Sequence, residues 1–362
     1  MPAARADHAG RREALARVLS PDLGGLLVTS VENVRYLTGF AGSHGAILLD
    51  RTGDSWLATD GRYLERAAAE APDVECLEAR RAAVTLVAKA RELGIARLGY
   101  DGASTTVEAL DALTKEAAGQ VELVRAPHLV EQLRSVKDPA ELAVIERACA
   151  ITAQAFEAVA GGLVTGMTER DVAWQLTVAM RERGADADAF DSIVAFGPHS
   201  AIPHHEPTDR PLQRGDLVKL DFGARVDGYC SDMTRTVVLG PGAAWQRELH
   251  EQVRQLQSGL SDAAVSGAVP SDLDAAMRAS LLGEGHHPLH GLGHGVGLAI
   301  HEDPFLTENS PAPALRAGCV VTIEPGIYLS GRGGVRIEDT VVVTESGAPR
   351  VLTTAPRDLL EV

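Results

Sequence analysis

The stretch Leu217–Val238 (LVKLDFGARVDGYCSDMTRTVV) constrains the fold of this chain more than any other, because it predicts a two-stranded ribbon. Apolar runs at its two ends indicate strands, and the Asp-Gly pair at 227–228 between them is the strongest short hairpin signal. If that pair forms the loop, Asp221 faces Thr234 across the ribbon. Asp232 then lies diagonally from Asp221 on the same face, close enough for the two carboxylates to share an ion.

Two like charges placed this close repel each other, and ionised carboxylates resist burial without a partner. A hairpin that carries both Asp221 and Asp232 therefore predicts bound cations. The alternative is that both aspartates are solvated turn residues, which is the commoner explanation for an isolated pair. The other motifs of the chain favour the cation site.

Length, charge and cysteine spacing narrow the class of protein. A chain of 362 residues exceeds the size at which single cores stop growing, so we expect two domains. The net charge of −16 argues against nucleic acid or an anionic membrane as a partner, since phosphates attract basic surfaces. Widely spaced cysteines, with no signal-peptide core and no apolar run long enough to span a membrane, predict a cytoplasmic protein with reduced thiols.

The order of the expected elements predicts two domains of different class. Short strands and helices alternate up to about residue 130, which is typical of a small α/β domain at residues 1–131. Asp138 and Pro139 fit the N-cap and the first position of a long helix, which belongs to a second domain at residues 132–362. In this second domain two helices followed by a ribbon occur twice, so we expect an α+β pseudo-repeat.

The second of these ribbons carries a pair of glutamates. Strands at 319–324 and 335–343 flank the turn Ser330–Gly334, and Glu324 and Glu338 lie nearly symmetrically about it. Buried glutamates usually have a partner, so two facing glutamates would repeat the arrangement of the aspartates. Taken alone, Glu338 would more simply pair with an arginine or point to solvent.

Three histidines, His290, His294 and His301, lie in a glycine-rich stretch between the two ribbons. The alternating glycines do not form the GxGxxG pattern, which argues against a dinucleotide site. Glycine at this density lets the backbone approach a neighbour closely. A single histidine here would more often be a packed structural residue, but three near paired carboxylates predict a metal or a substrate.

Five motifs carry these acidic residues and histidines: LDFG with Asp221, SDMTRT with Asp232, GLGHGVG with His294, EPGIY with Glu324 and RIEDT with Glu338. In order and spacing they resemble the metal-ligand motifs of the pita-bread metallopeptidase family, which includes methionine aminopeptidase, aminopeptidase P and prolidase. The likeness spans residues 136–362. The segment Tyr36–Phe40 (YLTGF) is similar to the smaller domain of the proline-specific branch. The resemblance implies a pita-bread fold preceded by a creatinase/prolidase-like α/β domain.

The resemblance also implies a centre of two divalent metal ions. Asp221 would chelate one ion, and His294 with Glu324 would hold the other. Asp232 and Glu338 would bridge both. Oxygen ligands with one imidazole suit Mn²⁺, Co²⁺, Fe²⁺ or Zn²⁺, and we expect Mn²⁺ first.

Four further residues match substrate and catalytic positions of the proline-specific branch. His204 looks like the histidine that contacts the substrate, although its neighbour His205 leaves a swap open. His290 and His301 look like the pair that lines the pocket and orients the substrate or shuttles a proton. Arg336 resembles an arginine that binds a substrate carboxylate, for which its planar fork is suited.

The function implied is hydrolysis of the bond between an N-terminal residue and a following proline, by a metal-activated bridging water. Proline-containing peptides are then the substrates, either dipeptides, as for prolidase, or longer peptides, as for aminopeptidase P. A homodimer is expected from the family. The alternatives are a methionine aminopeptidase-like hydrolase on the same fold and a non-catalytic module that binds peptides or proteins. No GxSxG motif supports a serine hydrolase.

Overall fold

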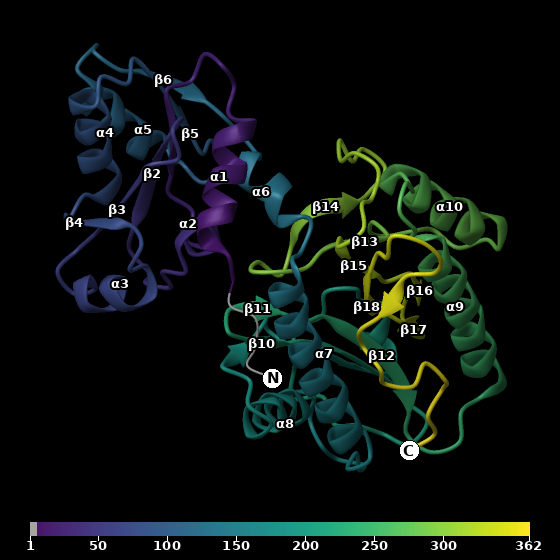
Figure 1. Cartoon of the computed structure of the whole chain (residues 1–362). Coiled ribbons are helices and arrows are strands. Elements are labelled where there is room, and N and C mark those ends of the chain that lie inside the picture. Colours follow the sequence, from purple (N-terminus) through teal and green to yellow (C-terminus); the bar gives the residue numbers. More distant parts are fainter. Residues whose placement is uncertain (1–5) are drawn as a thin grey trace. The chain divides into compact units, whose positions relative to one another are not determined.

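The computed structural model describes residues 6–362, which divide along the chain into two compact units, one ending at Arg134 and the other beginning at Ser135 (Figure 1). The first five residues of the predicted N-terminal domain lie outside the described part. The predicted boundary between residues 131 and 132 falls inside the last helix of the first unit. No helix within residues 6–362 is long and apolar enough to cross a membrane.

The N-terminal unit is a mixed sheet with helices, as the alternation of short elements predicted. Within residues 6–134, six strands form one sheet in the order β4-β3-β2-β1-β5-β6. The strands are β1 (Gly25–Val28), β2 (Ala46–Asp50), β3 (Ser55–Thr59), β4 (Glu75–Glu78), β5 (Arg97–Tyr100) and β6 (Glu122–Arg125). The helices are α1 (His8–Val18), α2 (Val31–Thr38), α3 (Leu64–Glu70), α4 (Ala82–Glu92), α5 (Val107–Ala117) and α6 (Leu129–Arg134).

The first half of the C-terminal unit contains the predicted hairpin. Its elements are α7 (Pro139–Ala160), α8 (Glu169–Glu182), β7 (Ala187–Asp188), β8 (Ile193–Phe196), the 3₁₀ helix η1 (Gly197–Ala201), β9 (Leu217–Phe222), β10 (Ala224–Val226), β11 (Tyr229–Cys230) and β12 (Met233–Val238). Asp221 pairs with Thr234, which confirms the predicted register. Asp227 (φ 44°) and Gly228 (φ 76°) both have positive φ, as a tight two-residue hairpin turn requires.

Local capping fixes where α7 begins, as predicted. The Asp138 carboxylate accepts hydrogen bonds from the backbone N–H groups of Ala140 and Glu141, and the Glu141 side chain accepts one from the Asp138 N–H. This capping box satisfies donors that the first helical turn would otherwise leave without a partner. Pro139 has no N–H to lose and fits the first turn.

The second half repeats the order of two helices and then a ribbon, as predicted. Its elements are α9 (Ala244–Ala263), α10 (Pro270–Gly283), β13 (Gly293–Gly295), β14 (Glu302–Leu306), β15 (Val320–Ile323), β16 (Gly326–Leu329), β17 (Gly333–Arg336), β18 (Asp339–Val342) and β19 (Arg350–Val351). Each half has its own hydrophobic core between its helices and its ribbon. Figure 1 shows α7 and α8 on one side of the strands and α9 on the other.

In the second ribbon the predicted strand at 319–324 is confirmed as β15, but the predicted strand at 335–343 is wrong as one element, because it is divided into β17 and β18 at Glu338. β15 pairs with β18 and β16 pairs with β17, while Glu324 and Glu338 lie in the gaps between them. Pro325 has no N–H for the ladder. The Glu324 N–H donates instead to Leu292 O at 2.9 Å, and the Glu338 N–H donates to Thr234 O at 3.1 Å. The break thus ties the second ribbon to β12 of the first.

Candidate metal centre

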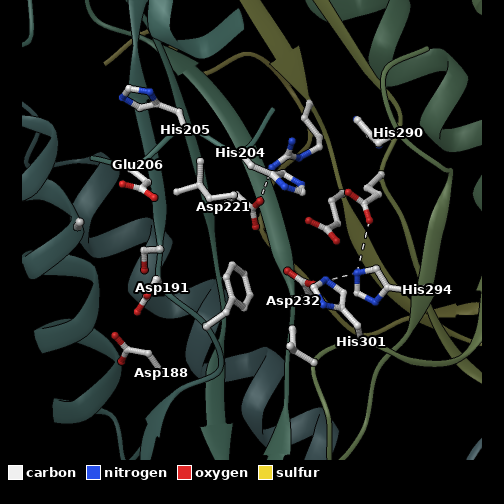
Figure 2. A pocket seen from close by; sticks show the side chains of 18 of the residues that line it. Asp188, Asp191, His204, His205, Glu206, Asp221, Asp232, His290, His294 and His301 are labelled. Atoms are coloured by element: carbon white, nitrogen blue, oxygen red, sulfur yellow. Dashed lines mark hydrogen bonds and ion pairs between the residues drawn. The ribbon is translucent and has the colours of Figure 1, made fainter. Parts of the chain in front are cut away.

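Both ribbons and β13 contribute an acidic or imidazole side chain to one cavity of about 870 Å³ (Figure 2). Asp221 extends from β9, and Asp232 lies between β11 and β12. His294 is the middle residue of β13. Glu324 follows β15, and Glu338 lies between β17 and β18. The five predicted ligand positions, which are far apart in the sequence, therefore line the same cavity.

His294 lies between two of these carboxylates. Its Nε2 atom is 3.6 Å from Asp232 Oδ2 and 3.5 Å from Glu324 Oε1, and dashed lines mark both contacts in Figure 2. One ligand atom each from Asp232, His294 and Glu338 lie within 4.8 Å of one another. A single cation can therefore contact side chains from both ribbons and from β13.

The two glycines that flank His294 let β13 fit between its neighbours. A Cβ atom at Gly293 would lie 2.1 Å from Thr322 O, and one at Gly295 would lie 2.4 Å from Asp303 O. The His294 Nδ1 atom lies 3.1 Å from the carbonyl oxygen of Gly295. A carbonyl accepts, so Nδ1 carries the proton and Nε2 presents its lone pair to the carboxylates.

Burial and mutual repulsion disfavour the charged forms of these acids. Burial and the neighbouring Glu338 carboxylate raise the pKa of Asp232 well above its ordinary value. Burial and the Glu324 carboxylate do the same to the pKa of Glu338. Burial raises the pKa of Glu324 to about 7. Burial also lowers the pKa of His294 to about 3, so its imidazole is neutral at pH 7. Cations would offset this repulsion and displace the acidic protons.

The residues present fit a metal ion. Among the residues that the structure describes, neither Asp221 Oδ1 nor Asp232 Oδ1 has a hydrogen-bond partner, although both atoms are buried. A buried carboxylate oxygen without a donor is costly unless a cation contacts it. Four carboxylates with one neutral imidazole form a ligand set suited to Mn²⁺, Fe²⁺, Co²⁺ or Zn²⁺.

Arg336, predicted to bind a substrate carboxylate, is 1% exposed and already bonded on several sides. Its Nε donates to Thr234 Oγ1 at 3.1 Å, and one terminal nitrogen donates to Pro203 O at 3.2 Å and to Tyr328 Oη at 2.9 Å. Its other terminal nitrogen forms an ion pair with Asp221. Arg336 therefore also supplies positive charge to the acidic centre. Its role toward substrate stays a prediction.

The three predicted substrate histidines all line the cavity. His290 Nε2 lies 2.8 Å from Tyr328 Oη, and burial lowers the pKa of His290 to about 4. The His301 ring packs edge-on against His294, with centroids 4.3 Å apart. His204 is exposed and points toward Asp221 in Figure 2. These rings therefore surround the carboxylates on the cavity side.

His205 has a different environment from its neighbour His204. It is 8% exposed, and its Nε2 atom lies 2.8 Å from Glu169 Oε2. Figure 2 shows its ring turned away from Asp221 and Asp232. The structure therefore favours His204 over His205 as the residue that faces the centre.

Sequence reasoning missed several side chains that support the centre. Thr234 Oγ1 donates to Glu338 Oε2 at 2.7 Å. Lys219 is fully buried, and its Nζ atom donates to the carbonyl oxygens of Ile202 and Pro203 at 2.6 and 3.0 Å. Burial lowers the pKa of Lys219 to about 6. A lysine inside the apolar run LVKLDF was a usable signal, since lysine is rarely buried without a partner.

Comparison with known proteins identifies the class. Residues 143–345 match metallopeptidase family M24, and residues 11–136 match the creatinase/prolidase N-terminal domain. The chain belongs to metallopeptidase family M24. It is a metallo-exopeptidase with an α+β pita-bread domain, as its motifs predicted, and this family uses divalent metals.

Individual relatives agree with this class. An Xaa-Pro dipeptidase of Pyrococcus horikoshii is 34% identical over 345 residues, which cover 92% of this chain and 94% of the relative. The structure of an Xaa-Pro dipeptidase from Bacillus anthracis has a TM-score of 0.93 at 34% identity and covers 98% of this chain and 100% of its own. The structure of an X-Pro aminopeptidase from Thermotoga maritima has a TM-score of 0.88 at 33% identity, with 97% and 99% covered.

Proposed function

We propose that this metallo-exopeptidase hydrolyses the bond between an N-terminal residue and a following proline, at a centre of two divalent cations. The observation that carries the proposal is the buried group of four carboxylates and one imidazole, in which Asp221 and Asp232 each have a carboxylate oxygen without a donor among the described residues. The names of the relatives, Xaa-Pro dipeptidase and X-Pro aminopeptidase, supply the substrate class.

The ligand roles are those that the resemblance to the pita-bread metallopeptidases implies. Asp221 would hold one cation, His294 and Glu324 the other, and Asp232 and Glu338 would contact both. When bound, two such cations supply a water that is nucleophilic at neutral pH and polarise the scissile carbonyl. Mn²⁺ is our first choice of metal, since this ligand set is mainly oxygen.

The histidines would act on the leaving proline. An X–Pro bond is a tertiary amide, so its nitrogen carries no proton and must receive one when the C–N bond breaks. His204 is the exposed ring in the cavity and the best placed to contact this end of the substrate. His290 is less available, because its two ring nitrogens already contact Gly291 O and Tyr328 Oη, each at 2.8 Å. We assign His290, like His301, to orienting the substrate.

The cavity also bears on substrate length. A volume of about 870 Å³ is near the upper end for small-molecule sites, so residues beyond the proline fit. The charge of Arg336 beside the cavity would favour a carboxylate at the prolyl end, even while its N–H groups keep their present partners. We therefore propose that both dipeptides and longer peptides are cleaved. The homodimer stays a prediction.

A peptide panel tests the proposal. Met-Pro, Met-Pro-Ala and Met-Ala-Ser would each be incubated with Mn²⁺, Co²⁺ or Zn²⁺, and with a chelator as control, while release of the first residue is measured. We expect metal-dependent cleavage before proline alone, and the ratio of dipeptide to tripeptide rates measures the length preference. Cleavage of Met-Ala-Ser alone would contradict the proposal and favour a methionine aminopeptidase-like hydrolase. No cleavage with any metal would favour a non-catalytic binding module.

A further inference from the structure

Two adjacent histidines on one irregular segment point in different directions. The segment 202–208 follows η1, begins the connection that leads to the strand β9, and has no regular secondary structure of its own. His204 lines the cavity and is exposed, whereas His205 is buried and faces Glu169. The direction of His204 therefore depends on what holds the rest of its segment.

Glu169, the first residue of α8, holds this segment from one side. Its side chain is fully buried. Its carboxylate accepts hydrogen bonds from the Phe196 N–H at 2.9 Å, the Thr208 N–H at 2.9 Å and the Thr208 hydroxyl at 2.6 Å, and lies 2.9 Å from His199 Nδ1 and 2.8 Å from His205 Nε2.

The charge state of Glu169 is consistent with these contacts. Burial alone would raise its pKa, but the hydrogen bonds from Thr208 and His205 outweigh burial and lower it. The carboxylate is therefore ionised at neutral pH and can only accept. Both imidazoles must then carry a proton on the nitrogen that faces it, which fixes the tautomer of His205.

Two buried basic side chains hold the same segment from its other end. Lys219 Nζ donates to Ile202 O and Pro203 O, and Arg336 donates to Pro203 O. His204 thus lies between two carbonyl groups that accept from Lys219 and Arg336 and a histidine that contacts the Glu169 carboxylate. Bonds to ionised groups such as Arg336 and Glu169 are the strong ones, so the backbone on both sides of His204 is fixed.

We propose that Glu169 is a positioning residue, which holds His205 and Thr208 so that the intervening backbone directs His204 toward the metal centre. This inference rests on the proposed function, because His204 is taken to contact the substrate there. The position of the segment 202–208 is independent of that function and can be tested separately.

A metal ion held by Glu169, His199 and His205 is the rival explanation, because one ligand atom from each lies within 4.8 Å of the others. The contacts of Glu169 argue against it. Both carboxylate oxygens already accept backbone N–H bonds, and the Thr208 hydroxyl adds a third donor to Oε2. No side-chain oxygen or nitrogen of these three residues is among the buried atoms without a partner in the described chain.

The substitution E169Q tests the proposal, since glutamine keeps the shape of glutamate but replaces one acceptor by an N–H₂ donor. Whichever way the amide turns, it faces either the Phe196 and His199 donors or those of Thr208 and His205. We expect kcat for Met-Pro to fall about tenfold or more, because small misplacements of a substrate-positioning group are costly. The metal content is expected to stay that of the wild type.

A double-mutant cycle with H204A separates positioning from general stability. If Glu169 acts through His204, then adding E169Q to H204A changes kcat less than twofold, although each single variant is impaired. If the two substitutions instead lower kcat by factors that multiply in the double variant, the proposal is overturned. Loss of one equivalent of metal in both E169Q and H205A would also overturn it and establish the metal site instead.

Two further variants keep the test interpretable. E141Q is the matched control, because Glu141 is another buried glutamate that accepts bonds, at 3.0 Å from Tyr229 Oη and from the Asp138 N–H, away from the cavity. It should lower stability and leave kcat unchanged. If E169Q does not fold, T208V takes its place in the test. It removes one hydrogen bond to Glu169 and should lower kcat two- to threefold.

The position of His204 in the proposal can be tested by crystallography without a substrate. A crystal structure of E169Q is expected to show His204 displaced from its wild-type direction, and an unmoved His204 would overturn the proposal. If wild type cleaves no Xaa-Pro peptide, the proposed function fails, whereas the crystal structure still decides whether Glu169 positions the segment.

Discussion

Thr234 is predicted to couple the charge of Arg336 to the metal-binding face of Glu338. Its side chain is fully buried in β12. The hydroxyl donates to Glu338 Oε2 at 2.7 Å and accepts from Arg336 Nε at 3.1 Å. The variant T234V keeps the shape of the side chain but leaves the buried Glu338 carboxyl group and the buried Arg336 guanidinium each short of one partner.

The magnitude follows from these two bonds. In the metal-free protein the bond to the Arg336 guanidinium contributes about 1.5–3 kcal/mol and the bond to the neutral Glu338 carboxyl group about 1 kcal/mol, so losing both should lower the free energy of unfolding by about 3 kcal/mol. Removing a residue that orients a metal ligand lowers metal affinity about tenfold to a hundredfold. We therefore expect T234V to be both less stable and weaker in binding Mn²⁺.

T236V is the matched control on the same strand. Thr236 is 2% exposed, and its hydroxyl donates to Arg336 O at 3.0 Å and accepts from the Arg336 N–H at 3.3 Å, so it bonds to neutral backbone groups. It should lose about 2 kcal/mol of stability and keep its metal affinity. Urea unfolding of the metal-free protein measures the first quantity and calorimetric titration with Mn²⁺ the second. Equal Mn²⁺ affinities for T234V and T236V would refute the reasoning.

Three further predictions concern other parts of the chain. D232N should abolish peptide hydrolysis and reduce the bound metal measured by elemental analysis, and full activity with unchanged metal would contradict the bridging role. Burial lowers the pKa of His250 to about 4 from 6.5, so its contribution to stability is present above pH 6.5 and lost as pH falls through 4. As pH falls from 6.5 to 4, the free energy of unfolding of the wild type, measured with urea, should drop by about 3 kcal/mol more than that of H250Q. The same pH dependence of stability in both proteins would count against this. Y328F removes the hydroxyl beside His290 and should lower kcat while metal content, measured alongside, stays constant; a loss of metal would show that Tyr328 supports the ligands instead.

The first hairpin was predictable in detail because its signals are local. An Asp-Gly turn sets the loop, and the alternation of strand side chains then fixes which residues share a face. The register of Asp221 opposite Thr234 followed from these two facts alone. The five predicted ligand positions were likewise carried by short motifs in a fixed order, and they line one cavity.

The second ribbon was harder because its course depends on distant partners. The Glu338 N–H bonds to Thr234 O in the other ribbon, and the Glu324 N–H bonds to Leu292 O. Pro325 was a local sign that the ladder would break there, since it offers no N–H. Sequence alone does not show which distant carbonyl groups the displaced N–H groups reach.

The supporting residues were missed for the same reason. Thr234 and Glu338 are 104 positions apart, and Glu169 and His205 are 36 apart. Threonine and glutamate near a helix start or inside a strand have common local explanations, such as capping or strand propensity. The Thr234–Glu338 contact appears only when the two halves of the C-terminal unit pack together, and the Glu169–His205 contact only when α8 packs against the segment that follows η1.

The central claim, that five side chains form one centre for two cations, is tested most directly by counting the metal. Protein stripped with a chelator would be titrated with Mn²⁺, and bound metal and Met-Pro hydrolysis would be measured on the same samples. The account predicts two equivalents per chain for the wild type and a reduced number for D232N, with activity that depends on bound metal. One equivalent or none at saturation, or hydrolysis that persists in the stripped protein, would contradict it.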